Sequence, residues 1–215
     1  SEEAPVSLKS ARVVANHLNK EKYTPYLVRI NRDKWVYVDE QNTEYPINRN
    51  DFSVAINGQK ITFEAVFNAI HGTPGEDGYL QAYFNLIGLP LTGCSMYASA
   101  LTFNKRDMLS VLKPFGILSA PSYYLNKGES YSTADIVAKV GLPCFVKPNK
   151  AGSSLGASKV NEEAALKEAI DKAFAVDDEI LIESFLKGTE ISIGVIETQY
   201  QKLTGPKVVG EKIDL

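Results

Sequence analysis

Residues 143–156 read PCFVKPNKAGSSLG and are the most informative stretch of this chain. A short apolar strand ends at Lys147 and opens into a loop rich in glycine and serine. Small residues let backbone N–H groups approach a ligand together, and proteins surround phosphate oxygens in this way. Because the lysine adds a positive charge beside the loop, we predict a polyphosphate site with ATP as its ligand. On this segment alone a plain hairpin turn is an equal alternative, since glycine and serine are ordinary turn residues.

The stretch differs from two commoner phosphate signatures. The Walker pattern places its lysine after the loop, whereas Lys147 precedes it. The dinucleotide fingerprint needs Gly-x-Gly-x-x-Gly, and only Gly152 and Gly156 are present. Residues 157–160 read as a second short strand. We therefore expect the loop to join two antiparallel strands and to cover the phosphates like a lid.

Composition limits the class of protein. The 215 residues are 44% hydrophobic, which is enough for a real core in one or two domains. A net charge of -3 without a basic run argues against a nucleic-acid partner. No window reaches the roughly 18 apolar residues of a membrane span, and no signal peptide is visible, so no membrane partner is expected. Cys94 and Cys144 sit among apolar neighbours, which predicts two buried free thiols and a cytoplasmic protein.

The first part of the chain alternates helix and strand signals. Residues 8–19 read as a helix with Ser7 as a candidate N-cap, and residues 79–86 read as a second helix. Between them lie strand-like stretches at 26–29, 35–39, 47, 54–55 and 66–70. This order predicts an α/β sheet with ligand-facing loops at the strand ends.

A second unit begins near Gly93. Its predicted elements are helices at 96–112, 133–140 and 162–174 and strands at 121–125, 143–147, 157–160, 179–183 and 190–197. Ser132 and Asp135 form a capping box before one helix, and Asn161 can cap the next. Two histidines in the whole chain are too few and too distant to suggest zinc.

Two further segments carry groups that could bind a ligand. Residues 71–78, HGTPGEDG, expose carboxylates on glycine turns that can hold an amino group, and His71 can hold a carboxylate; a solvated acidic turn is the alternative. Residues 182–190, IESFLKGTE, place Glu183 and Glu190 around an apolar hinge suited to adenine and ribose, or form an ordinary connection. Lys105 could reach phosphates or be a surface lysine, and Glu3 complements a helix dipole.

Taken in order, these segments resemble the ATP-grasp D-alanine–D-alanine ligases of bacterial cell-wall synthesis. The resemblance spans about residues 1–197 and is more specific than any single motif. Its matching pieces are Glu3 with 6–8, 71–72 with 75–78, 88–93, 98–101, Lys105, 146–148, 152–156, and 181–183 with Gly188 and Glu190.

The resemblance implies an α/β fold in three parts. They are an N-terminal Rossmann-like parallel-sheet domain (1–93), a smaller α+β ATP-grasp domain (94–183) and the beginning of a third domain (184–215). It also implies an ATP-dependent ligase that joins two D-alanines through a D-alanyl phosphate for peptidoglycan synthesis, with magnesium or manganese as cofactor, in the cytoplasm and as a homodimer.

Residue roles follow from the same resemblance by position. Glu3 would hold the ammonium group of the first D-alanine, with His71 and Ser153 nearby, and Glu3 and Ser153 would be the catalytic pair. The ATP contacts would be phosphates at Lys105, Lys147, Ser153 and Ser154, adenine at Glu183 and the Leu186 backbone, and ribose at Glu190.

The chain departs from the family at both ends. No strand with a glycine pair precedes Ser1, and after residue 197 we find no counterpart of the family's metal-binding carboxylates; Glu211 and Asp214 have a different context. We therefore expect an incomplete chain with no metal site, inactive on its own. The alternatives are another carboxylate–amine ligase, such as a D-alanine–D-lactate ligase, and a non-catalytic nucleotide-binding fragment.

Overall fold

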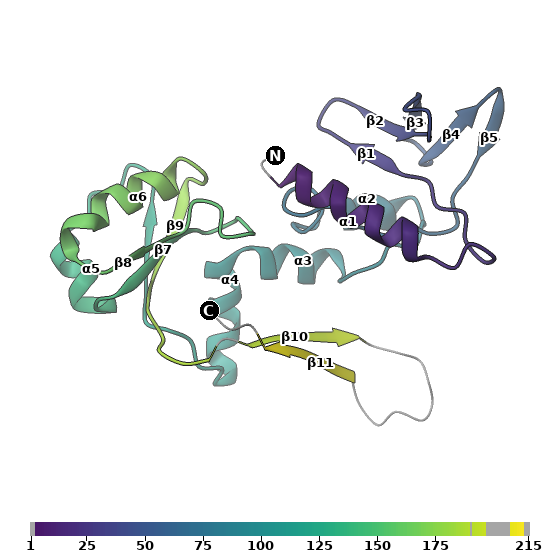
Figure 1. The fold of residues 1–215 in the computed structure, drawn as a ribbon. Helices are drawn as coiled ribbons and strands as arrows, with labels where there is room; N and C mark the ends of the chain where they lie inside the picture. The colour runs from purple at the N-terminus through teal and green to yellow at the C-terminus, as the bar shows by residue number, and fades with distance from the viewer. Residues whose placement is uncertain (1–2, 190, 197–206, 213–215) are drawn as a thin grey trace.

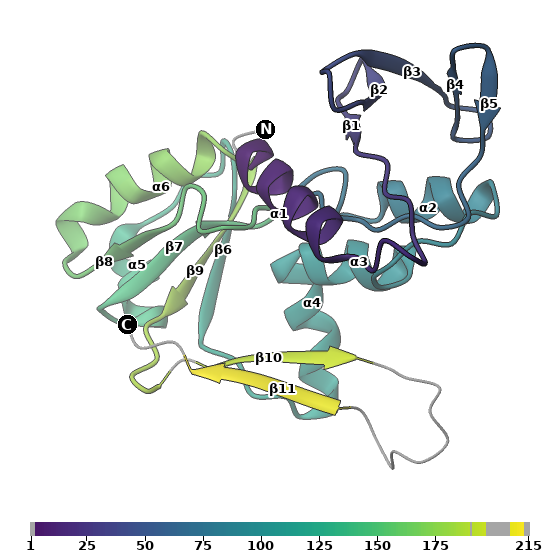
Figure 2. The ribbon, with the colours of Figure 1, turned by 45° about the vertical axis from the view of Figure 1, so that its right-hand side comes forward.

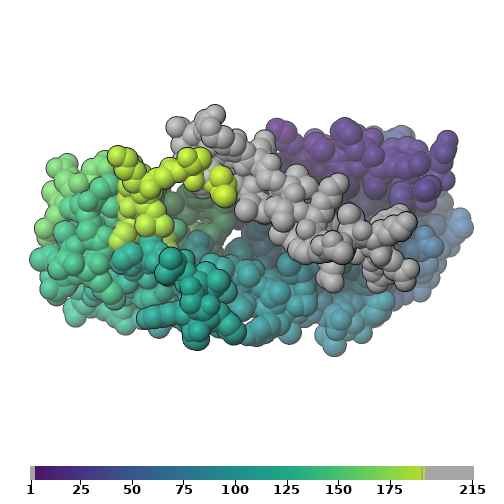
Figure 3. All heavy atoms as spheres, turned by 90° about the horizontal axis from the view of Figure 1, so that it is seen from below, coloured from purple at the N-terminus to yellow at the C-terminus, as the bar shows by residue number. Residues whose placement is uncertain are grey.

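The structure is a computed structural model that describes residues 3–189, 191–196 and 207–212. Two α/β units lie at opposite ends of the molecule, and a pair of helices lies between them (Figure 1). The space-filling view from below shows the same arrangement, with the teal residues between the purple and green ends (Figure 3). Within the described residues, no helix combines the length and apolar character needed to cross a lipid bilayer.

The first unit contains a five-stranded sheet, and both of its helices lie below the strands in the view of Figure 1. Its strands follow one another in the order β1-β2-β3-β4-β5, and every neighbouring pair is antiparallel. Phe84 is buried against Phe52, with ring centroids 4.7 Å apart, at the centre of this core. The elements are α1 (Ala4–His17), β1 (Val28–Ile30), β2 (Trp35–Val38), β3 (Glu44–Asn48), β4 (Ser53–Ile56), β5 (Gln59–Ile61) and α2 (Tyr79–Leu86).

The mixed α/β class is confirmed, but the parallel sheet predicted for residues 1–93 is not what these strands form. Consecutive strands are joined by short turns, which permit only antiparallel pairing. The single parallel pairing found among the described residues of this unit is the bridge between Val66 and Leu91. Residues 66–70 do not continue as a strand. The Asn68 backbone N–H donates to Thr92 Oγ1 and its side-chain Nδ2 donates to the Gly75 carbonyl, so this backbone N–H is not available to a neighbouring strand.

Helix α1 begins earlier than predicted. It starts at Ala4 with a proline in its first turn, a position that proline favours. Ser7 therefore lies inside the helix and is not its N-cap. Instead, Ser7 Oγ donates to the Glu3 carbonyl and accepts a hydrogen bond from the His71 backbone N–H at 3.0 Å. Its role is to connect the helix to the 71–78 loop.

The helix predicted over 96–112 is two helices, α3 (Met96–Phe103) and α4 (Lys105–Leu112). Asn104 separates them in an extended conformation, and its side chain accepts a hydrogen bond from the Asp107 N–H at 3.1 Å. Asparagine side chains compete with the backbone in this way and favour caps over helix interiors. As a result, Lys105 is the first residue of a helix whose first turn contacts the second unit.

The second unit is a four-stranded antiparallel sheet in the order β6-β9-β7-β8, with α5 and α6 on one face (Figure 2). Its core includes Ile136, Val146, Ile170 and Ile182, none of which is exposed. The elements are β6 (Ser122–Asn126), α5 (Thr133–Val140), β7 (Cys144–Pro148), β8 (Ser158–Val160), a 3-10 turn (Glu163–Ala165), α6 (Leu166–Phe174) and β9 (Glu179–Ser184).

Several local sequence patterns predicted the structure of this unit correctly. Ser132 caps α5 by accepting from the Asp135 N–H at 3.2 Å, and Gly141 ends the helix with a φ of 70°. Asn161 does not cap the next helix, which opens with the 3-10 turn at Glu163–Ala165 instead. Cys144 is a buried free thiol as predicted. Cys94 is free but exposed, because it lies in the connection before α3 and not in an element that packs.

The end of the described chain is a two-stranded antiparallel ribbon. Strand β10 (Ile191–Ile196) confirms the strand predicted over 190–197, and it pairs with β11 (Lys207–Lys212), a strand that was not predicted. Glu190, the predicted ribose contact, lies outside the described residues, as do most of residues 198–215.

Candidate functional site

The 143–156 stretch folds as a strand, a loop and a strand. Strands β7 and β8 pair antiparallel, with Val146 opposite Ser158, so the predicted connection is confirmed. Ser153 and Ser154 both adopt positive φ, at 51° and 56°, and the Leu155 N–H donates to the Gly152 carbonyl at 3.0 Å. Left-handed backbone at two non-glycine residues is costly and is concentrated at ligand-binding loops. The loop tip is therefore a strained turn held in one shape.

Lys147 projects from the end of β7 toward the neighbouring strand β9. Phe145 lies directly opposite Glu183 in the sheet, so Lys147, two residues further on, shares that face with both. The Lys147 ammonium forms an ion pair with the Glu183 carboxylate. The two side chains are 30% and 16% exposed, so the ion pair is partly accessible to a ligand.

Lys105 approaches the same loop from α4. Its Nζ donates to the Ala151 carbonyl at 2.6 Å and to the Asn149 carbonyl at 3.2 Å. Burial of the half-buried ammonium lowers the pKa of Lys105, and the positive charge of Lys147 lowers it further. Two lysines from different elements thus converge on the beginning of one loop. Such a pair can hold an anion with several negative oxygens.

The tip of the loop reaches across to the first unit. Ser153 Oγ donates a hydrogen bond of 2.8 Å to Glu3 Oε1, although the two residues are 150 positions apart. Glu3 is only 8% exposed. The carboxylate predicted from the family resemblance therefore lies beside the loop between β7 and β8.

A second carboxylate, which was not among the predicted site residues, lies in the same place. Glu76 Oε2 accepts from the Gly72 N–H at 2.7 Å. A Cβ on Gly152 would lie 3.0 Å from Glu3 Oε1 and 3.6 Å from Glu76 Oε2, which places both acids against the loop backbone. The HGTPGEDG pattern was the signal for it. Two carboxylates at close range can bind a primary ammonium group.

His71 is held by α1. Its backbone N–H donates to Ser7 Oγ, and its ring Nε2 lies 3.1 Å from Ser10 Oγ. The ring is thus positioned at the base of the 71–78 loop. No hydrogen bond joins His71 to Glu3 or to Ser153 in the described part of the chain.

The predicted adenine segment is the connection after β9. Leu186 is 68% exposed, and Phe185 packs on Phe145 with ring centroids 5.9 Å apart. Lys159 Nζ lies 4.0 Å from the centre of the Phe185 ring. Glu183 lies at the start of this segment and connects it to Lys147.

Replacing Gly72 by alanine should displace Glu3. A Cβ at this position would lie 2.1 Å from Glu3 Oε2, and the backbone φ of +70° disfavours a side chain. We expect Gly72→Ala to lower the free energy of unfolding by about 2–4 kcal/mol, through left-handed strain plus the loss of the Ser153 hydrogen bond when the Glu3 carboxylate moves aside. Urea-induced unfolding measures this change.

The matched control is Gly58→Ala, where φ is +81° and no atom lies within 4 Å of the new Cβ. It should show only the strain, about 1–2 kcal/mol. Equal losses in the two variants would mean that the Glu3 carboxylate is not held against Gly72.

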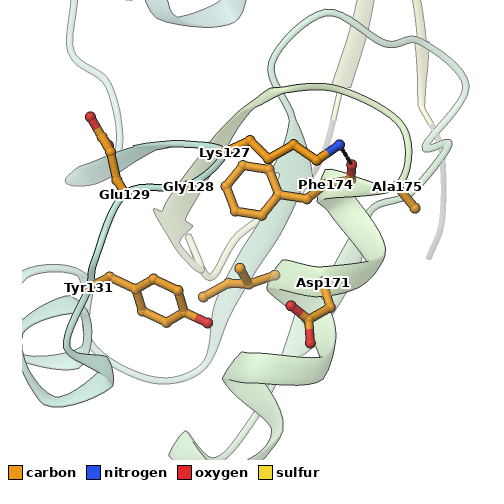
Figure 4. Close-up of a pocket in the computed structure, with 8 residues that line it drawn as sticks. Lys127, Gly128, Glu129, Tyr131, Asp171, Phe174 and Ala175 are labelled. Carbon is orange, nitrogen blue, oxygen red and sulfur yellow. Dashed lines mark hydrogen bonds between the residues drawn. The ribbon is translucent and has the colours of Figure 1, made fainter.

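An open depression of about 480 Å³ lies elsewhere, beside α6 (Figure 4). Lys127 reaches across Phe174 and donates to its carbonyl at 3.2 Å, while Tyr131 and Asp171 line the other side. None of the predicted site residues lines it. The arrangement of lysines and carboxylates described above is therefore the better candidate site.

Metal ligands do not gather anywhere in residues 3–189, 191–196 or 207–212: no group of three histidine, cysteine, aspartate or glutamate side chains could hold an ion. These residues therefore do not fit a magnesium site, and we assign no step of the chemistry to one.

An antiparallel four-stranded sheet backed by two helices, with a strand-end lysine below a glycine–serine loop, defines an α/β protein of the ATP-grasp class. Two family models match the chain: "D-ala D-ala ligase N-terminus" over residues 1–94 and "D-ala D-ala ligase C-terminus" over residues 111–213. The chain therefore belongs to the D-alanine–D-alanine ligase family.

Individual relatives agree with this assignment. The chain is 65% identical to a D-alanine–D-alanine ligase of Flavobacterium johnsoniae over 91% of its own length, and 52% identical to one of Christiangramia forsetii over 96%. It spans 61% and 63% of these two relatives. A solved D-alanine–D-alanine ligase from Coxiella burnetii matches with a TM-score of 0.86 and 25% identity, over 99% of this chain and 68% of that one.

Proposed function

We propose that this chain is part of an ATP-dependent ligase that joins two D-alanine molecules for peptidoglycan synthesis. The observation that carries the proposal is the hydrogen bond from Ser153 to Glu3. It brings the candidate phosphate loop to the carboxylate that would bind the amino acid. The terminal phosphate of ATP and the carboxylate of the amino-acid substrate must lie side by side if the phosphoryl group is to pass from one to the other.

The residues of this chain would bind and orient the reactants. Lys105 and Lys147 would bind the ATP phosphates, and the backbone N–H groups around Ser153 and Ser154 would cover them. Negative charge spreads over the transferring phosphoryl oxygens, so fixed cations and N–H groups stabilise that transition state. Glu183 and the Leu186 backbone would contact adenine, and Glu190 the ribose.

The amino acid would bind on the other side of the loop. Glu3, supported by Glu76, would hold its ammonium group, which leaves the carboxylate directed toward the phosphates, with His71 and Ser153 nearby. Transfer of the terminal phosphoryl group to that carboxylate releases ADP and gives an acyl phosphate. The amine of the second D-alanine then attacks the acyl carbon, phosphate leaves, and the amine loses a proton.

Four further features belong to the proposal and rest on the family resemblance and the cysteine content. They are the division at 1–93, 94–183 and 184–215, a homodimer, a cytoplasmic location, and a requirement for magnesium or manganese. The metal ligands would come from outside the described residues. Because the chain spans about three fifths of its curated relatives, the remaining part of the site would lie in the rest of the longer protein.

Phosphate release from ATP tests the activity. With the full-length protein, magnesium and ATP, release should depend on D-alanine and be accompanied by D-alanyl-D-alanine. The 215-residue chain should show no release under the same conditions. D-Lactate and D-serine should also be offered as second substrates, because a related ligase would use one of them. A product that contains either of them, formed in preference to D-alanyl-D-alanine, would change the assignment. Release that is independent of D-alanine would reject it.

A further inference from the structure

Asn149 is a buried polar residue directly after β7, and the roles above do not use it. It is only 1% exposed. Its Oδ1 accepts from the Arg106 N–H at 2.8 Å, and its Nδ2 donates to Asn104 Oδ1 at 2.8 Å and to Glu179 Oε2 at 2.9 Å. A buried amide is stable only when its donors and acceptors are satisfied, and these three bonds satisfy it.

Two of these three hydrogen bonds go to the residues on either side of Lys105. Asn104 and Arg106 are the two neighbours of Lys105, so the Asn149 side chain holds the chain on both sides of it. The Asn149 carbonyl also accepts from the Lys105 backbone N–H at 3.3 Å and from its Nζ at 3.2 Å. Asn104 in turn caps α4 through the Asp107 N–H. One residue of the second unit therefore fixes the position of the first turn of α4.

The opposite end of this clamp is anchored in the sheet. The Asn149 backbone N–H donates to the Glu179 carbonyl at 2.9 Å, and the Glu179 carboxylate also pairs with Lys150 at 2.9 Å. Both bonds tie the start of the loop to the first residue of β9. A movement of α4 away from the loop must therefore break its bonds to Asn149, a residue that is itself held by strand β9.

Lys105 needs such a clamp because its surroundings disfavour its charge. Burial and the positive charge of Lys147 lower its pKa, while the carboxylates of Glu183, Asp177 and Glu3 act in the opposite direction. An unrestrained lysine side chain would avoid this burial by rotating toward the solvent. A neutral asparagine can hold the lysine in place without adding a charge to the site.

We propose that Asn149 is a positioning residue that holds Lys105 beside Lys147 before any ligand arrives. This inference rests on the proposed function, because the pair of lysines matters only if it binds phosphates. It concerns a residue that would touch no substrate and would act through the position of α4.

Two readouts on Asn149→Ala separate this role from the function itself. The first needs no nucleotide: trace acetylation of the 215-residue chain over a range of pH, followed by peptide mass spectrometry, gives the rate and pH midpoint for Lys105. We expect faster labelling and an upward shift of the midpoint in the variant, because the ammonium moves out of its buried position. The second is the affinity for ATP, which should fall about fivefold, the factor for one lost hydrogen bond.

The control is Ser132→Ala, which removes the exposed N-cap hydrogen bond of α5, remote from Lys105. It should lower stability without changing the labelling of Lys105. Asn149→Ser, whose hydroxyl can replace one of the three bonds, should give an intermediate labelling rate and serves if the alanine variant does not fold.

Unchanged Lys105 labelling in a folded Asn149 variant would overturn the proposal. Failure of both variants to fold would do so too, because it would make Asn149 a residue of the fold and not of the site. A shifted midpoint in a protein that shows no ATP binding even as wild type would support the clamp and reject the proposed function.

Discussion

Replacing Ile182 by alanine is expected to lower the free energy of unfolding of the second unit by about 2–5 kcal/mol. Ile182 lies in the middle of β9, opposite Tyr123 of β6 and Val146 of β7, and none of it is exposed. Removing three buried carbons leaves a cavity that the strands on either side cannot close. Against a typical stability of about 5–15 kcal/mol, this loss is large.

Urea-induced unfolding, followed by circular dichroism, measures the change. Ile117→Ala is the matched control, since that isoleucine is 54% exposed and should lose little. Ile182→Val should lose about 0.5–1.5 kcal/mol, which gives a graded series. Similar losses at positions 182 and 117 would contradict the packing of β9 in this core. The consequence for function is direct, because Glu183 is the next residue on the same strand.

The second unit was largely predictable because its signals are local. Ser132 and Gly141 mark the ends of a helix through their own backbone bonds, and residues 143–156 contain a strand, its turn and the returning strand. Such patterns need no information from distant parts of the chain. The pairing of Lys147 with Glu183 also follows once β7 and β9 are known to be neighbours.

The first unit was less predictable, because the conformation of its wrongly predicted segments depends on partners that are distant in the sequence. Ser7 resembles an N-cap, but its hydroxyl is bonded to the Glu3 carbonyl and to His71, 64 residues away. The 66–70 run has strand composition, yet it forms a single parallel bridge. Asn104, in the helix pair between the two units, could have been recognised, since asparagine interrupts an otherwise apolar helical pattern there.

The candidate site itself combines both kinds of information. The residues alone predicted a phosphate loop, with a hairpin turn as an equal alternative, and an acidic glycine-rich segment, and they assigned Glu3 only to a helix dipole. That Glu3 meets Ser153 across 150 residues could come only from the family resemblance or from the fold. Asn149 was missed because nothing in a single sequence shows that a polar residue after a strand is buried.

Replacing Lys147 by alanine should weaken ATP binding by about 1–3 kcal/mol, the scale of a lost charge-assisted bond. This corresponds to a dissociation constant about 5- to 150-fold higher. The physical reason is the loss of a fixed ammonium group beside the loop, one that is 30% exposed and so able to meet a ligand. Isothermal titration with ATP measures the effect, and Lys167→Ala on the exposed surface of α6 is the control.

The ion pair complicates this experiment, because Lys147→Ala also leaves Glu183 without its partner. A double-mutant cycle with Glu183→Gln separates the two effects. If Lys147 contacts phosphate, its removal will still weaken binding when position 183 carries no charge. If the loss comes only from an unpaired carboxylate that distorts β9, the effect of Lys147→Ala will disappear in the Glu183→Gln background. That disappearance would remove Lys147 from the phosphate site, and with it the main reason for placing a nucleotide under the loop between β7 and β8.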